Sequence, residues 1–179
     1  MTGCVPFESK RLFPPDALLE PAAMPAGLRL SFTRDTSSLI LCLDAQAEDP
    51  QKLDVYADGM LCESLNAAGV GDLRVAGLPG GEKLLELWLP QYGEVRVKSL
   101  AIDDGASLTA YEDRRPKWVT YRSSITHCRA AQSPSNTWPA IAARTLDLDL
   151  TCLGYGGNCH PEPMMARMIR DLPADYLSM

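Results

Sequence analysis

The sequence predicts a two-part α+β chain, in which an antiparallel β-sandwich precedes a partial α/β domain with a parallel sheet. Two observations predict this order. Between Gly27 and Thr109, short runs with alternating apolar residues follow one another closely and are joined by turns rich in glycine and proline, which is typical of a sandwich. After residue 117, apolar strand-like runs alternate with segments of helical spacing, which favours parallel strands with right-handed crossovers.

Composition limits the class of protein. The 179 residues suit one or two domains, and 46% apolar with 22% charged residues is ordinary for a globular protein. A net charge of −6 and a pI of about 4.9 argue against a nucleic-acid partner, which requires clustered Lys and Arg. The sequence has neither a bilayer-length apolar run nor the apolar segment of a secretory signal, so we expect no membrane partner. The six cysteines lack paired spacing, which indicates reduced thiols and a cytoplasmic location.

The first part of the chain divides into a leader and the sandwich. Residues 1–24 are rich in proline and lack a clear period, so we expect an irregular leader with one turn of helix at 16–23. The sandwich is expected over 25–111, with strands in jelly-roll order. Its clearest signal is Asp58-Gly59 between two apolar runs, because this dipeptide favours a tight hairpin.

The second part begins after a short linker. Residues 112–116 are charged and include a proline, which is typical of a connection between domains. Residues 117–179 then read as strand, helix, strand, helix and strand, so we expect a partial parallel sheet. The alternating Asp147 and Asp149 lie near the start of the second strand, where we expect a solvated turn.

Each predicted helix has an apolar face. Thr137 is the expected N-cap of the first helix, and Pro139 falls in its first turn. The spacing predicts that one core-facing side of this helix carries Trp138, Ile141, Ala142 and Leu146. The corresponding face of the second helix carries Met164, Met168 and Leu172.

Two loops should meet at one edge of the parallel sheet. Residues 122–128 follow the first strand and contain Ser123 and Ser124, and the glycine-rich residues 154–160 follow the second strand. Ligands of such sheets bind beyond the carboxyl ends of the strands. An exposed hydroxyl and backbone N–H donors are the groups that acyl transfer requires. The pattern alone leaves another interpretation open, because serines after strands commonly cap helices or form turns.

Several blocks of the sequence resemble SGNH/GDSL-type esterases, and in particular the branch with a β-sandwich before the hydrolase domain. The two most specific blocks are YRSSITH at 121–127 and CLGYGGN at 152–158, and stretches at 24–32 and 77–91 are also similar. The resemblance extends from about residue 24 to the end. It implies a flavodoxin-like parallel sheet, hydrolysis of acyl esters with carbohydrate esters among the candidates, and no metal or organic cofactor.

The resemblance also assigns roles to residues. Ser124 matches the nucleophile, and its own N–H would contribute to the oxyanion hole. Gly157 matches a second N–H donor, with Gly156 as the alternative if the register differs by one. Arg122 stands where the family has glycine, so we expect strain in the nucleophile loop. The family's third-block Asn and its Asp-x-x-His are missing, so we expect a truncated hydrolase domain that is weakly active or inactive.

Only two histidines, His127 and His160, are available as a base for the serine. A triad base normally comes from elsewhere in the fold and is oriented by a carboxylate, so we expect neither histidine to fill this role. The pairs His127-Cys128 and Cys159-His160 offer zinc ligands, but adjacent ligands are unusual in structural zinc sites and we expect no metal. Cys128 has no evident partner as a nucleophile.

A second function stays open at this point, namely a non-catalytic module that binds a glycan or a protein and carries a vestigial hydrolase part. Trp88 and Tyr92 are candidates for a sugar-binding face, although buried aromatic residues are commoner in sandwiches. The last predicted strand, at 174–179, would form an open sheet edge. Such an edge favours pairing with another copy or with a partner chain.

Overall fold

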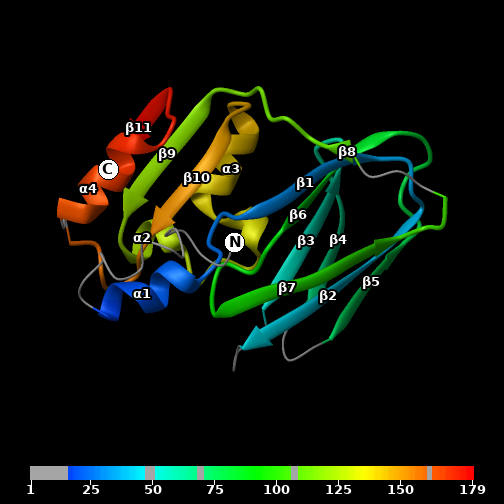
Figure 1. The fold of residues 1–179 in the computed structure, drawn as a ribbon, viewed down its shortest axis with the longest axis horizontal. Coiled ribbons are helices and arrows are strands. Elements are labelled where there is room, and N and C mark those ends of the chain that lie inside the picture. The colour runs from blue at the N-terminus through cyan, green and yellow to red at the C-terminus, as the bar shows by residue number, and fades with distance from the viewer. Residues whose placement is uncertain (1–15, 47–50, 68–70, 106–108, 161–162) are drawn as a thin grey trace.

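The chain folds into two parts that lie side by side, a larger one built from antiparallel strands and a smaller α/β part (Figure 1). The computed structural model describes residues 16–46, 51–67, 71–105, 109–160 and 163–179. Most of the predicted leader, residues 1–15 with Cys4, lies outside the described residues. None of the helices in the described ranges has the length and apolar character needed to cross a bilayer.

The larger part contains two antiparallel sheets. A five-stranded sheet has the order β4-β3-β6-β1-β8, and its strands are β1 (Arg29–Arg34), β3 (Lys52–Ala57), β4 (Met60–Asn66), β6 (Lys83–Trp88) and β8 (Thr109–Ala110). A three-stranded sheet has the order β5-β2-β7, and its strands are β2 (Ser38–Gln46), β5 (Asp72–Ala76) and β7 (Glu94–Ile102). The predicted fold class is confirmed, whereas the jelly-roll order stays a prediction.

Alternation along the strands builds one core between these two sheets. The buried side chains come from both sheets and include Leu41, Val55, Val75, Leu85 and Leu87. The hairpin between β3 and β4 turns at Asp58 and Gly59, whose φ angles are 47° and 78°. Two positive φ angles are what a two-residue type I′ turn needs, which explains why the Asp-Gly signal in the sequence is informative.

The smaller part has three parallel strands. β9 (Lys117–Arg122) lies in the centre and pairs with β10 (Asp149–Gly154) on one side and β11 (Tyr176–Ser178) on the other. The connections include α2 (Ser124–His127), a 3₁₀ turn (Pro134–Asn136), α3 (Trp138–Thr145) and α4 (Pro163–Asp171). This is the predicted order of strands and helices. Tyr176 and Leu177 of β11 are 56% and 50% exposed.

The amino-terminal helix belongs to the core of the smaller part. The helix α1 (Asp16–Ala23) has eight residues, about two turns, where the sequence predicts one. Ala22 is buried in a cluster with Val119 and Leu153, and Leu19 packs against the same cluster. In Figure 1, α1 and α2 lie on the side toward which the arrowheads of β9 and β10 point.

The helix α3 buries a different face from the one predicted. Its buried side chains are Pro139, Ala140 and Ala143, whereas Trp138, Ile141 and Leu146 are 41%, 46% and 65% exposed. Small residues allow the helix backbone to approach its neighbours closely, so the alanine face packs inward and the larger apolar side chains lie outside. The predicted N-cap is correct, because the Thr137 hydroxyl accepts a hydrogen bond from the Ala140 N–H.

The helix α4 follows its predicted apolar face only approximately. Met165 and Ile169 are its buried residues. Met164, Met168 and Leu172 are partly buried around the same cluster. The predicted apolar face of α4 is therefore rotated by about one residue from the face that is buried.

A third apolar cluster joins the two parts. Tyr56 and Trp88 from the sandwich pack with Trp118 of β9, with Ala140 and Ala143 of α3, and with Leu150 and Cys152 of β10. The Tyr56 hydroxyl lies 3.0 Å from the Ser135 Oγ, and the Ser135 N–H donates to the Asp54 carboxylate over 3.0 Å. Trp88 is 1% exposed and therefore cannot line a sugar-binding face.

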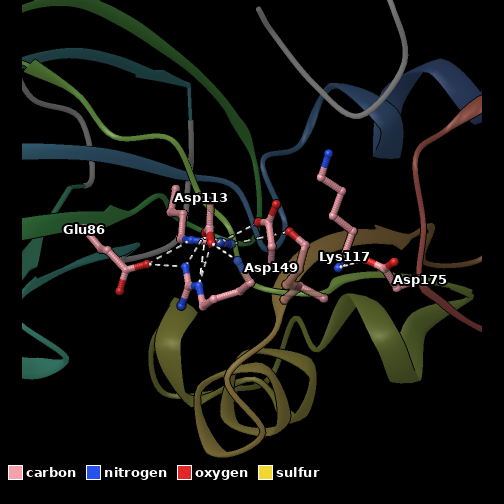
Figure 2. A network of polar contacts seen from close by, with 8 residues as sticks. Glu86, Asp113, Lys117, Asp149 and Asp175 are labelled. Atoms are coloured by element: carbon pink, nitrogen blue, oxygen red, sulfur yellow. Dashed lines mark hydrogen bonds and ion pairs between the residues drawn. The ribbon is translucent and has the colours of Figure 1, made fainter.

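A network of charged groups forms a second contact between the two parts (Figure 2). The Arg29 guanidinium contacts Glu86 at 3.0 Å, Asp113 at 3.0 Å and Asp149 at 2.7 Å. Arg115 pairs with Glu86 and Asp113 as well. The predicted linker thus contributes Asp113 and Arg115 to a partly buried network. The expectation of a solvated turn is wrong for Asp149, because its carboxylate is held by a cation from β1.

Candidate active site

Ser124 begins α2 directly after β9, at the carboxyl edge of the parallel sheet. The residue is exposed, and its hydroxyl forms no hydrogen bond with another residue in the described part of the chain. Ser123 is the N-cap of α2 and makes no side-chain capping bond. The alternative interpretation, in which the serine hydroxyls cap a helix, is therefore not what the geometry shows.

The glycine-rich loop after β10 lies beside Ser124. A Cβ placed on Gly156 would be 3.9 Å from the Ser124 Cα. Two residues earlier, at the end of β10, a Cβ on Gly154 would lie 2.5 Å from the His127 backbone N, so only glycine permits this approach of α2 to the strand end. The Tyr155 N–H donates to the Arg122 carbonyl over 2.8 Å and continues the pairing of β9 with β10 into the loops. The two predicted loops are therefore neighbours.

His127 fills the space between this loop and the sandwich. Its side chain is 4% exposed. Nδ1 accepts a hydrogen bond from the Gly156 N–H at 3.2 Å, and Nε2 lies 2.8 Å from the Gln91 carbonyl oxygen. Burial lowers the pKa of His127 and the Arg129 cation lowers it further, although the bond to Gln91 acts in the opposite direction.

These contacts leave His127 with no ring nitrogen that could accept the proton of the Ser124 hydroxyl. A general base needs a free lone pair within hydrogen-bond reach of the proton it takes. Both ring nitrogens already have partners. His160 is exposed and is not part of the cavity that contains Ser124. Its carbonyl accepts a hydrogen bond of 2.6 Å from the Tyr121 hydroxyl.

A cavity of about 290 Å³ opens at Ser124. Its walls come from α1, from the segment after β6, from α2 and from the glycine-rich loop, and the lining residues are Glu20, Pro21, Met24, Tyr92, Ser124, His127, Arg129, Gly156 and Asn158. The Arg129 guanidinium lies 3.8 Å above the Tyr92 ring. The cavity thus combines one nucleophilic hydroxyl with apolar, aromatic and charged surfaces.

Several of these residues have no signal in the sequence. Glu20 and Met24 precede the sandwich, and Gln91 and Tyr92 follow its strand β6, so all four are distant from Ser124 along the chain. Only the fold brings them to the carboxyl edge of the parallel sheet. The available hints were the similarity of stretches 24–32 and 77–91 to the esterase branch and the candidacy of Tyr92 for a sugar-binding face.

Arg122 and Cys128 are accommodated in ways that the sequence does not reveal. Arg122 is exposed at the end of β9 and is not among the described non-glycine residues with positive φ, so the expected strain at this position is not present. Cys128 carries the unusual angle instead, with φ of 54°. Its thiol donates to the Ile125 carbonyl, and burial raises the pKa of Cys128, which disfavours the nucleophilic thiolate. No group of three or more potential metal-ligating side chains occurs among residues in the described ranges.

The buried neutral His127 predicts a pH-dependent stability. Because its pKa in the folded chain is lowered from the ordinary value, the unfolded chain takes up a proton first as the pH falls below about 6.5. The free energy of unfolding should then decrease by up to about 1.4 kcal/mol per pH unit. Urea unfolding between about pH 8 and pH 5 measures this slope, in a window above the titration of ordinary carboxyl groups near pH 4.

The matched variants are His127→Asn and His160→Asn. The slope should disappear in His127→Asn, since the titrating group is gone, and should persist in His160→Asn, since that side chain is exposed. An unchanged slope in His127→Asn would contradict the assignment.

Comparison with known proteins supports this geometry. The model of the family described as "SsfX3, N-terminal domain" matches residues 2–98, just over half of the chain. The solved structure of the salicylyl-acyltransferase SsfX3 from a tetracycline biosynthetic pathway is 37% identical, with a TM-score of 0.91 over 99% of this chain. No curated protein matches the sequence.

Two further solved structures share the fold at lower identity. A GDSL-like lipase from Bacteroides ovatus ATCC 8483 is 24% identical with a TM-score of 0.81, over 99% of this chain and 57% of its own. A family two carbohydrate esterase from Clostridium thermocellum is 18% identical with a TM-score of 0.58, over 77% of this chain and 50% of its own. The chain covers 53% of the length of the SsfX3 structure, so it spans about half of these relatives.

Proposed function

Because the chain belongs to the SsfX3 N-terminal domain family, we propose that it carries the nucleophile half of a serine acyl-transfer site, with Ser124 as the nucleophile. The observation that supports this most directly is the placement of Ser124. Its hydroxyl is exposed at the end of a parallel strand, lines a cavity and lies beside a glycine-rich loop. These are the parts that an SGNH-type esterase or acyltransferase needs.

The proposed chemistry has two steps. The Ser124 oxygen attacks an ester carbonyl, the carbonyl electron pair moves onto oxygen, and the hydroxyl proton passes to a base. The N–H groups of Ser124 and Gly157 stabilise the oxyanion until the alcohol leaves with a proton. Water or an acceptor alcohol then attacks the acyl-enzyme, which gives hydrolysis or transfer. No metal or organic cofactor takes part in this scheme.

The cavity supports a small acyl group as the substrate. A volume of about 290 Å³ is at the lower end of ligand pockets. The named relatives include a salicylyl-acyltransferase and carbohydrate esterases, so esters of an aromatic acid or of a sugar are the substrate classes that we propose to test. The described cysteines are free thiols, which supports the proposed cytoplasmic location.

We further propose that the chain alone turns over slowly. The sequence has two histidines, of which His127 is engaged at both nitrogens and His160 lies outside the cavity. Ser124 therefore has no imidazole to take its proton. Loss of a triad base typically lowers the rate by about 10³-fold or more.

Rescue by free imidazole tests this proposal. Imidazole in the cavity would supply the missing base, so hydrolysis of a small aryl acetate should be very slow without imidazole and should rise several-fold above background as imidazole is added. Ser124→Ala should abolish the protein-dependent part, because the nucleophile is gone. The neighbouring Ser123→Ala is the matched control and should keep it, since Ser123 is not part of the cavity lining.

Two outcomes would count against the proposal. Rescue that is equal in Ser124→Ala and in the unaltered chain would show that imidazole alone hydrolyses the ester. Fast, Ser124-dependent turnover without imidazole would show that a residue of this chain already acts as the base.

The second candidate function is a non-catalytic binding module, and the lack of an available imidazole base at Ser124 favours it. In this case the cavity would bind an acyl ester or a glycan without cleaving it. Saturable binding together with absent imidazole rescue would support this function. The exposed apolar residues of β11 support the related proposal of a second copy or a partner chain at that sheet edge.

A further inference from the structure

We propose that His127 is a positioning residue that couples the sandwich to the oxyanion hole and selects Gly157 as its loop donor. This inference rests on the proposed function of Ser124. Its basis is a continuous line of contacts, from the Gln91 carbonyl through the His127 ring to the Gly156 N–H. The family resemblance matches Gly157 but leaves Gly156 as the alternative, and these contacts distinguish the two.

The contacts determine the protonation of the ring. The Gln91 carbonyl only accepts hydrogen bonds, so Nε2 must carry a proton. The Gly156 N–H only donates, so Nδ1 must be unprotonated. The neutral Nε2–H tautomer is the one form that satisfies both partners. Protonation at Nδ1 would place two N–H groups against each other and release the loop.

The cation beside His127 favours this neutral form. Arg129 lies on the cavity side, stacked on Tyr92, whose ring centroid is 6.1 Å from that of His127. A cation at this place opposes a second positive charge. Glu20 also lines the cavity and is the one carboxylate among its described lining residues.

The anchor for the histidine is firmly held. Gln91 is 4% exposed, and its side-chain Nε2 donates to the Ala131 carbonyl over 3.0 Å. Two residues earlier, the Leu89 N–H donates to the Leu28 carbonyl over 3.0 Å, which ties this segment to the sandwich. The position of the glycine-rich loop is therefore set by the sandwich as well as by the parallel sheet.

The bond to His127 removes one of the two candidate donors. The Gly156 N–H is occupied, whereas the Gly157 N–H forms no hydrogen bond with any other residue in the described ranges. Gly157 is exposed, has a φ of 80°, and has open space where a Cβ would be. Asn158 closes the turn through its N–H to the Tyr155 carbonyl at 3.1 Å. Gly157 is thus the loop residue whose N–H is available to a developing oxyanion.

Nitrogen-15 NMR of the unaltered chain provides a test that needs neither activity nor a variant. The His127 ring should show the signals of the neutral Nε2–H tautomer at neutral pH and should retain them to a lower pH than an ordinary histidine does, because burial and Arg129 lower its pKa. The Gly156 amide should exchange with solvent more slowly than the Gly157 amide. A protonated ring at neutral pH, or the Nδ1–H tautomer, would overturn the inference.

Two variants separate the two hydrogen bonds of the ring. In His127→Asn the side-chain oxygen takes the place of Nδ1 and keeps the acceptor for Gly156. In His127→Gln the side-chain N–H₂ takes the place of Nε2 and keeps only the donor to Gln91. Slow exchange of the Gly156 amide should therefore persist in His127→Asn and be lost in His127→Gln.

The imidazole-rescued rate should differ between the two variants in the same direction. We expect kcat of His127→Gln to fall about tenfold or more with little change in KM, because a displaced donor weakens oxyanion stabilisation. His127→Asn should lose less of kcat than His127→Gln, because it keeps the acceptor for the Gly156 N–H. Equal Gly156 exchange in both variants, or equal rates in both, would overturn the inference. Absence of rescue in the unaltered chain would count against the proposed function, and the NMR measurements would still decide the role of His127.

Discussion

Replacement of Arg29 by alanine is expected to lower the free energy of unfolding by about 3–5 kcal/mol, the usual cost of removing one partner from a buried ion pair. The Arg29 side chain is 7% exposed, and its main partner Glu86 is 4% exposed. Without Arg29, the carboxylates of Glu86 and Asp113 would share only the Arg115 cation, and Asp149 would lose its ion pair with Arg29. Buried carboxylates that lack a full counter-charge cannot recover their hydration.

The measurement is urea unfolding at neutral pH, with Arg96→Ala as the matched control. Arg96 also pairs with a glutamate, Glu94, but these side chains are 55% and 40% exposed. Loss of this pair should cost less than about 1 kcal/mol, because water screens it. A similar small loss in Arg29→Ala would show that the network adds no stability at the junction.

Gly154→Ala should have the second large effect, on stability and on Ser124 together. The added Cβ would lie 2.5 Å from the His127 N and 2.7 Å from both the His127 Cα and the Thr126 carbonyl carbon. These are backbone atoms, so no side-chain rotation relieves the contact. We expect a loss of about 3 kcal/mol, the upper part of the usual range for overpacking, and a displaced α2. Since α2 begins at Ser124, the imidazole-rescued rate should fall as well.

Gly80→Ala is the control for this prediction. Gly80 has open space where a Cβ would be and no positive φ. The substitution should change the free energy of unfolding by no more than about 1 kcal/mol, with a small gain expected from the stiffer unfolded chain. If Gly154→Ala is as stable as Gly80→Ala, the close approach of α2 to β10 is not part of the fold in solution.

The sequence predicts the elements of this fold better than their faces. Asp58-Gly59 specifies its hairpin because few other dipeptides adopt two positive φ angles. The predicted buried face of α3 was wrong. An apolar stripe indicates which side chains of a helix can be buried, but the neighbouring elements determine which of them are buried. The close packing of Ala140 and Ala143 depends on Tyr56 and Trp88, which come from a distant part of the chain.

The candidate site likewise has one part that the local sequence predicts and another part that it does not. Ser124 and the glycine-rich loop follow directly from the positions of two strands, so local sequence places them. Gln91 and Glu20 lie at the site only because of the packing of the sandwich and of α1, and no local sequence pattern predicts such contacts. The choice between Gly156 and Gly157 required the position of a single hydrogen-bond acceptor on His127.

The apolar cluster shared by the two parts limits how this protein can be recombined with its relatives. Exchange of the sandwich for a foreign one would place unfamiliar side chains against Trp118 and α3, where Tyr56 and Trp88 now fit. A chimera joined within residues 112–116 would also divide the charged network between two parents, because Asp113 and Arg115 lie inside that segment. The unit that can be exchanged as a whole is therefore the sandwich together with its matching surface on β9, β10 and α3.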